Sequence, residues 1–265
     1  MVADTGLAAR GLCKVFHPGS ADERIALDEV NLTLAPGDFA VVIGSNGAGK
    51  STLLNALAGE VRLDAGTVTI GADDLTALPT HRRARWVSRV FQDPLIGTAA
   101  SMTIEENLAV AESRGNTRTL APALTRAGRS RYTALLASLG LGLESRLGTK
   151  VSMLSGGQRQ ALALLMAVMK RPALLLLDEH TAALDPRTAE AVMTATLAAI
   201  NDAHLTTLMV THNMNHALRF GNRLLMMHAG RVVLDVSGEQ KSQLTVEGLV
   251  EKFHLVDDKM LLATS

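Results

Sequence analysis

Aromatic residues, cysteine and an excess of either charge are all scarce in this sequence. Phe, Trp and Tyr make up 3% of its 265 residues, so the core has to be built mainly from aliphatic side chains. The single cysteine, Cys13, cannot form an internal disulfide, which excludes a small disulfide scaffold. Lys and Arg number 26, as do Asp and Glu, whereas nucleic-acid-binding proteins usually carry a basic excess. We therefore expect no nucleic-acid partner.

Long uncharged hydrophobic runs are also absent. The most apolar stretch, residues 161–177, is interrupted by Lys170, Arg171 and Pro172, and neither part approaches the roughly 20 apolar residues of a membrane span. The first ten residues contain Asp4 and no apolar segment, so we expect no signal peptide. Because 47% of the residues are apolar and 20% are charged, the composition is that of a soluble globular protein with ample material for a core.

Short apolar runs alternate with amphipathic segments along the chain, which indicates an α/β fold with a largely parallel sheet. The segment from about 103 to 148 has a helical pattern and no strong β-run, as an inserted helical subdomain would have. The expected strands are 11–16, 30–34, 39–43, 67–70, 86–91, 173–177 and 205–210, followed by a hairpin over 223–228 and 231–236. The clearest expected helices begin near Lys50 and span 158–169 and 187–203.

A glycine-rich motif lies between the expected strand 39–43 and the following helix. It fits the pattern G-x-x-x-x-G-K-[ST]. Its glycines let backbone N–H groups turn toward an anion, and the start of a helix adds positive potential. Lys50 would reach the β- and γ-phosphates, and the Ser51 hydroxyl would bind Mg²⁺. The predicted nucleoside triphosphate site consists of Gly44, Ser45, Asn46, Gly47, Ala48, Gly49, Lys50, Ser51 and Thr52.

Two carboxylates, Asp178 and Glu179, follow four consecutive leucines. In a parallel α/β sheet, ligands bind at the carboxyl edge of the strands, where this pair is expected to lie. Asp178 would face Mg²⁺ through a water molecule. Glu179 is placed to accept a proton from an attacking water.

The segment Ser155-Gly156-Gly157-Gln158 precedes a long amphipathic helix, and alone it would be an ordinary helix N-cap. Its position between the two phosphate motifs, in this order, resembles the ATP-binding subunit of an ABC transporter. The resemblance runs from about Leu12 to about Val236.

This resemblance implies one P-loop NTPase domain with a RecA-like core, an antiparallel β-subdomain and an inserted helical subdomain. The core would span about 1–92 and 158–238, the helical subdomain about 93–157, and a short helical tail 239–265.

The same resemblance implies roles for further residues. Gln92 matches the glutamine that senses Mg²⁺ and the attacking water, and Asp185 lies in the segment that matches the D-loop. His212 matches the switch histidine that contacts the γ-phosphate. Phe16 matches the aromatic residue that stacks on adenine, although a core phenylalanine at a strand end fits the sequence as well.

A working ATPase of this family is a dimer. Two subunits sandwich two ATP molecules head-to-tail, and residues 155–158 of one subunit cover the γ-phosphate held by Lys50 of the other. We therefore expect a homodimer that uses ATP and Mg²⁺. The catalytic residues would be Glu179, His212, Gln92 and Lys50, and the metal-binding residues Ser51, Gln92 and Asp178.

Three segments resemble a bacterial import subgroup of the tryptophan/tyrosine type. They are the run 92–108, the run 226–230, and His180 at a position where most relatives carry proline. The resemblance implies permease subunits, an extracytoplasmic substrate-binding protein and a peripheral location at the cytoplasmic face of the bacterial inner membrane. His180 has two interpretations: a group near the γ-phosphate that titrates near neutrality, or a histidine tolerated where backbone geometry matters more.

Other functions remain open at this point. An ABC exporter or lipid-trafficking ATPase differs from an importer only by family likeness. Non-transport relatives in translation or iron–sulfur assembly are disfavoured, because this chain has one ATPase cassette, zero net charge and the import-type segments. A nucleotide-binding switch without hydrolysis is disfavoured by the presence of Glu179 and His212.

Overall fold

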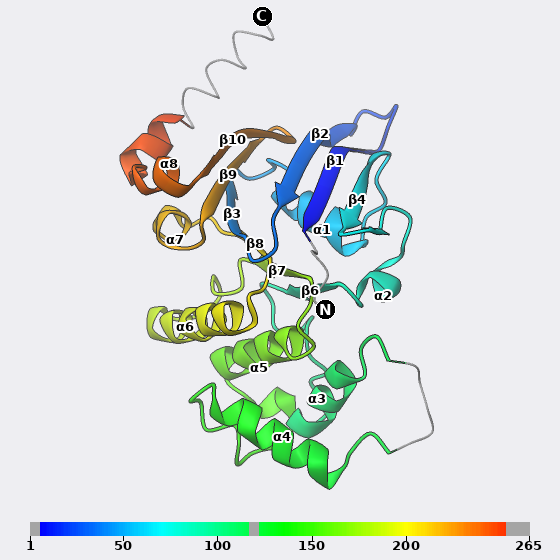
Figure 1. Ribbon diagram of the computed structural model, residues 1–265, viewed down its shortest axis with the longest axis vertical. Helices are drawn as coiled ribbons and strands as arrows, with labels where there is room; N and C mark the ends of the chain where they lie inside the picture. The colour runs from blue at the N-terminus through cyan, green and yellow to red at the C-terminus, as the bar shows by residue number, and fades with distance from the viewer. Residues whose placement is uncertain (1–5, 117–121, 253–265) are drawn as a thin grey trace, which may run out of the picture. The chain divides into compact units, whose positions relative to one another are not determined.

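The computed structural model describes residues 6–116 and 122–252. The described residues form two compact units, one from the segments 1–80 and 206–265 and the other from the segment 81–205 (Figure 1). No helix in the described ranges is long and apolar enough to cross a membrane. Residues 253–265 of the expected helical tail lie outside these ranges, and the sequence-based division into core, helical subdomain and tail stays a prediction.

The first unit contains an antiparallel sheet with the strand order β2-β1-β4-β5. Val30, Leu32 and Leu34 are buried while the residues between them are exposed, the period of two that a strand with one covered face requires. This sheet confirms the expected antiparallel β-subdomain. Its strands are β1 (Leu7–Phe16), β2 (Arg24–Leu34), β4 (Ala65–Ile70) and β5 (Asp73–Asp74).

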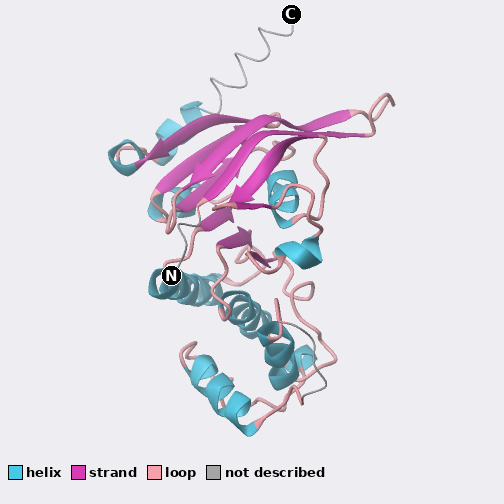
Figure 2. Cartoon of the chain, turned by 45° about the vertical axis from the view of Figure 1, so that its right-hand side comes forward, coloured by secondary structure: helices cyan, strands magenta, loops and turns pink. Residues whose placement is uncertain are grey.

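A second group of strands in the first unit surrounds β3. β3 is parallel to both β8 and β9, and β10 pairs antiparallel with β9, so the hairpin expected from the sequence is confirmed (the strands are labelled in Figure 1 and drawn in magenta in Figure 2). Residues 40–43 are each at most 1% exposed, as expected for a strand covered on both faces. These strands are β3 (Phe39–Gly44), β8 (Thr207–Val210), β9 (Arg223–His228) and β10 (Arg231–Ser237).

The chain leaves β3 at Gly44 and enters helix α1 (Lys50–Ala58) through a turn that only glycine permits. Gly49 has φ +100°, and a Cβ atom there would lie 2.3 Å from the Ala26 carbonyl oxygen. Both facts exclude a side chain at this position. The remaining helices of the unit are α7 (Met214–Arg219) and α8 (Gly238–Ser242). Helix α2 (Thr80–Arg83) begins at residue 80, where the first segment of this unit ends.

The second unit holds two parallel strands, β6 and β7, and a largely helical remainder. The described part of 103–148 contains helices and no β-strand, as expected. In Figure 1, α5 and α6 lie side by side. The elements are β6 (Val87–Val90), α3 (Ile104–Glu112), α4 (Arg126–Ala137), a 3₁₀ turn (Val151–Met153), α5 (Gly156–Val168), β7 (Leu174–Asp178) and α6 (Pro186–Ala203).

Tyr132 lies in the hydrophobic cluster that joins α3, α4 and α5, together with Ile104, Leu136 and Leu162. It is 1% exposed, and its hydroxyl donates a hydrogen bond to Glu112. Burial disfavours the phenolate and the Glu112 carboxylate adds repulsion, and together they raise the pKa of Tyr132 to about 12.

Tyr132 is the one tyrosine of the chain, so its ionisation can be followed directly. We expect tyrosinate absorbance of the folded protein to appear with a pKa of about 12, against about 10 in the unfolded chain. Because the folded pKa is the higher one, the stability that Tyr132 contributes is fully present below pH ~10 and is lost as the pH rises through ~12. Appearance of tyrosinate near pH 10, in protein that circular dichroism shows to be folded, would contradict the buried environment of Tyr132. The Tyr132→Phe variant has no tyrosine and supplies the background absorbance.

Candidate functional site

In the predicted phosphate loop, the ammonium group of Lys50 is directed toward the backbone of the loop itself. Lys50 is 8% exposed, and its Nζ donates to the carbonyl oxygens of Gly44 at 2.7 Å and Ser45 at 2.9 Å. A second cation, Arg24, donates from Nη2 to the Gly47 carbonyl oxygen at 2.9 Å. Sequence reasoning missed Arg24, because nothing local ties residue 24 of β2 to the loop.

The start of α1 is suited to an anion. Its N-cap, Gly49, makes no side-chain capping hydrogen bond, and its first turn contains no acidic residue. The first N–H groups of a helix have no partner within the helix and carry the positive end of its dipole. Ser51 is exposed at this end. A phosphate group is the kind of ligand that such an end binds.

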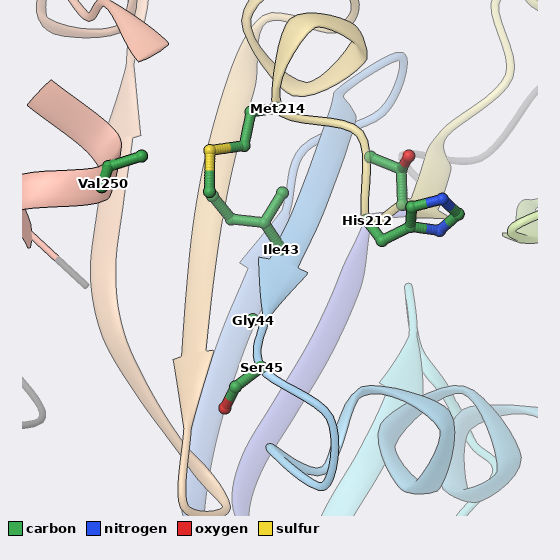
Figure 3. Close-up of a pocket in the computed structure, with 7 residues that line it drawn as sticks. Ile43, Gly44, Ser45, His212, Met214 and Val250 are labelled. Carbon is green, nitrogen blue, oxygen red and sulfur yellow. The ribbon is translucent and has the colours of Figure 1, made fainter. Parts of the chain in front are cut away.

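His212 meets the phosphate loop at one pocket of the first unit. The pocket has a volume of about 310 Å³ and is lined by Ile43, Gly44, Ser45, Thr211, His212, Met214 and Val250. In Figure 3 the imidazole of His212 points away from the apolar side chains of Met214 and Val250. The structure therefore brings together two elements that the sequence predicted as partners, the loop and the histidine after β8.

Phe16 ends β1 in the same unit and is partly exposed. It is not a fully buried core phenylalanine, which was the alternative left open by the sequence. The Lys14 ammonium lies 5.5 Å from the centre of its ring.

In the second unit, Asp178 ends β7 after four leucines that are at most 1% exposed. Its Oδ2 accepts a hydrogen bond from Arg89 Nη2 at 2.6 Å, with side-chain exposures of 9% for Arg89 and 17% for Asp178. Arg89 lies on the neighbouring strand β6, and its guanidinium is 4.7 Å from the centre of the Phe91 ring. Sequence reasoning missed this partner, although an arginine within an expected buried strand was a signal.

Glu179 adopts a backbone conformation that is rare for its residue type. Its φ is +43°, in the left-handed region, which costs a non-glycine residue roughly 1–2 kcal/mol. The turn is closed by a hydrogen bond from the Ala182 N–H to the Glu179 carbonyl oxygen at 2.9 Å. Strain of this kind persists where the surroundings fix the chain, and it is concentrated at functional sites.

Gln92 lies at the same sheet edge as the two carboxylates. Val90 pairs with Leu177 across the parallel strands, so Gln92 and Asp178 both follow the last paired residues. Gln160 on α5 donates to the Phe91 carbonyl oxygen at 3.0 Å and holds this strand end. The second unit therefore brings Gln92, Asp178 and Glu179 to one edge.

The Ser155–Gln158 segment forms a capping box at the start of α5. The Ser155 hydroxyl accepts from the Gln158 N–H at 3.2 Å, and the Gln158 side chain accepts from the Ser155 N–H at 3.3 Å. The ordinary N-cap interpretation is thus correct for the local structure. Ser155 and Gly156 are nevertheless exposed, and their polar groups are accessible to a ligand.

Gly157 lets α5 approach α6 closely, because a Cβ atom there would lie 2.0 Å from Cγ2 of Thr188. Asp185 caps α6 by accepting from the Thr188 N–H at 3.1 Å. Hydrogen bonds from the Thr188 side chain and backbone hold the pKa of Asp185 below its ordinary value, so it carries a negative charge at neutral pH. The signature segment and the D-loop aspartate therefore meet at Thr188.

The predicted magnesium ligands have suitable chemistry. A serine hydroxyl, an amide oxygen and a carboxylate are the hard oxygen donors that Mg²⁺ prefers. Arg89 donates to Oδ2 of Asp178 at 2.6 Å. No group of three or more His, Cys, Asp or Glu able to hold a metal is found in the described part of the chain. Each of these groups is by its chemistry a suitable donor to Mg²⁺ that arrives with nucleotide phosphates.

Comparisons with known proteins agree with this arrangement. The family model described as ABC transporter matches residues 27–182. The tyrosine transport ATP-binding protein of Clostridioides difficile is 44% identical over 93% of this chain and 98% of that relative. The lipoprotein-releasing system ATP-binding protein LolD 1 of Caulobacter vibrioides is 35% identical over 87% of this chain and 95% of that relative.

Solved structures give the same result. The ADP conformation of MJ1267, an ATP-binding cassette of an ABC transporter, has a TM-score of 0.77 at 25% identity and covers 95% of this chain and 98% of its own. The dimeric post-hydrolysis state of the cassette MJ0796, bound to ADP and Pi, has a TM-score of 0.74 at 28% identity, covering 87% and 98%. The chain thus belongs to the ABC transporter family and is one of its ATP-binding cassettes, an ATPase with a P-loop α/β fold.

Proposed function

We propose that this chain is the ATPase subunit that powers a bacterial ABC importer for amino acids or related small solutes. The observation that carries the proposal is the 44% identity to a tyrosine transport ATP-binding protein along 93% of this chain. An exporter or lipid-trafficking role is the second candidate, because the similarity to a lipoprotein-releasing ATPase also extends over 87% of the chain.

In this proposal the first unit binds the nucleotide. The N–H groups of loop 44–52 and the start of α1 hold the phosphates, and the Lys50 ammonium exchanges its two carbonyl partners for phosphate oxygens. Phe16 stacks on the adenine, with its ring partly exposed for that contact. Ser51, Gln92 and Asp178 would hold Mg²⁺, which neutralises charge on the phosphates.

The second unit supplies the base in this proposal. Glu179 accepts a proton from the attacking water while Gln92 orients that water. His212 donates a hydrogen bond to the γ-phosphate. Phosphoryl transfer depends on positioning and electrostatic stabilisation, so the fixed backbone of Glu179 supports its assignment as the base.

We also propose a head-to-tail homodimer. Ser155 and Gly156 are exposed at the start of α5, with N–H groups suited to a γ-phosphate held by the other subunit. The D-loop residue Asp185 is exposed beside them. The similar cassette MJ0796 has been solved as a dimer, which supports this arrangement.

A permease is the proposed membrane partner, and an extracytoplasmic substrate-binding protein would act through it. Leu95 and Ile96, which follow Gln92, are 51% and 66% exposed, and Met153, next to the signature segment, is 70% exposed. Leu95 and Ile96 are adjacent in sequence, and exposed apolar residues that stand together are more typical of contact sites than isolated ones. The subunit would then be peripheral, at the cytoplasmic face of the inner membrane.

Glu179→Gln tests the base and the dimer together. Loss of the proton acceptor should lower hydrolysis by about 10²–10⁴-fold, while ATP binding remains and an ATP-bound dimer accumulates in size-exclusion chromatography with light scattering. The exposed Glu247→Gln is the matched control and should behave like the wild type. If Glu179→Gln hydrolyses ATP at the wild-type rate, Glu179 is not the base. If it remains a monomer at saturating ATP, the proposed dimer is contradicted.

Capture of the tagged protein from native membranes tests the transport role. We expect recovery of a polytopic permease with a periplasmic or lipid-anchored binding protein. The double variant Leu95→Ser with Ile96→Ser should no longer capture the permease but should still bind ATP. Val110 on α3 is 57% exposed, and the control variant Val110→Ser should retain both the permease and ATP binding. Soluble assembly factors or ribosomes in place of a permease would refute the transport role, and a permease without a binding protein would favour the exporter.

A further inference from the structure

His180 is a buried histidine directly after Glu179. It is 2% exposed, and its Nε2 lies 3.1 Å from Oγ1 of Thr196 in the middle of α6. Thr196 is itself 0% exposed. The imidazole is therefore held against α6, as expected of a histidine with a structural role at this turn.

The direction of this hydrogen bond follows from the threonine. Oγ1 of Thr196 donates its single proton to the Val192 carbonyl oxygen at 2.8 Å. The hydroxyl can then only accept from the imidazole. Nε2 of His180 consequently carries a hydrogen and donates to Thr196.

Both sequence neighbours of Glu179 are anchored to other elements. On one side, Asp178 is held by Arg89 of β6 at 2.6 Å. On the other side, His180 is held by Thr196 of α6 at 3.1 Å. Between them the Glu179 backbone keeps φ +43°, a conformation that persists where the surroundings fix the chain.

We propose that His180 is a positioning residue, whose hydrogen bond to Thr196 fixes the turn that directs the Glu179 carboxylate. The inference rests on the proposed role of Glu179 as the base. His180 acts through the backbone and does not touch the nucleotide. Its loss should therefore lower kcat and leave the KM for ATP unchanged, since displacement of a reacting group by about 1 Å can cost about 10²-fold in rate.

Thr196→Val is the first test, because it removes the hydroxyl and keeps the volume. We expect kcat to fall by about 10- to 100-fold, with KM and ATP affinity within about twofold of wild type. Thr196→Ser restores the acceptor and should recover most of kcat. Thr194→Val is the matched control: Thr194 is exposed on the same helix, and its hydroxyl also bonds a carbonyl one turn back, that of Glu190, at 2.9 Å.

A double variant separates positioning from stability. Thr196→Val alone removes the acceptor of the buried Nε2 hydrogen of His180, whereas His180→Phe with Thr196→Val replaces both partners by apolar groups, which can be nearly neutral for stability. We expect the double variant to fold, as judged by its thermal transition, and to retain the low kcat. If both variants fail to fold, the bond serves the fold and not the turn, and the positioning role is overturned.

The remaining outcomes distinguish this inference from the proposed function. Wild-type kcat in folded Thr196→Val, or a raised KM with kcat unchanged, would overturn the role of His180. If Glu179→Gln is inactive while Thr196→Val is fully active, only this inference fails. If Glu179→Gln hydrolyses ATP at the wild-type rate, the proposed base itself fails.

Discussion

The constraint on which the nucleotide chemistry depends is that backbone N–H groups must face an anion without a side chain in the way. Gly49 meets it with φ +100° and no room for a Cβ atom beside Ala26. The loop is held at both ends, by β3, which is buried on both faces, and by α1, whose leucines Leu53, Leu54 and Leu57 are fully buried. A rigid frame of this kind keeps the donors in place before the ligand arrives, so little ordering remains to be done on binding.

The second unit fixes the backbone that carries the Glu179 carboxylate. Glu179 stands in a strained turn between two anchored neighbours, one bonded to Arg89 and the other to Thr196. Strain of this kind persists where partners on both sides fix the chain, and a fixed backbone suits the proposed role of Glu179 as the base. Ser155 and Asp185 are exposed, and the proposed dimer assigns them to contacts with the second subunit.

Local patterns predicted much of this. The phosphate loop, β3, β7 and the β9–β10 hairpin follow from continuous apolar runs and from a motif whose residues are adjacent in sequence. β1 and β2 are longer than predicted, because register shifts between Ala9 and Leu12 break the alternation that marks a strand. The Arg89–Asp178 and His180–Thr196 contacts were not predicted, since the partners are 89 and 16 residues apart and meet only through tertiary packing; the one signal was an arginine within an expected buried strand.

The central claim is that one chain cannot complete a hydrolytic site, because the loop of one subunit needs the signature segment of another. The most direct measurement is specific ATPase activity over a dilution series, with the mass of the species in solution followed in parallel. The account predicts that hydrolysis per chain falls in proportion to the dimer fraction. Full activity per chain in a solution that contains only monomer would contradict it.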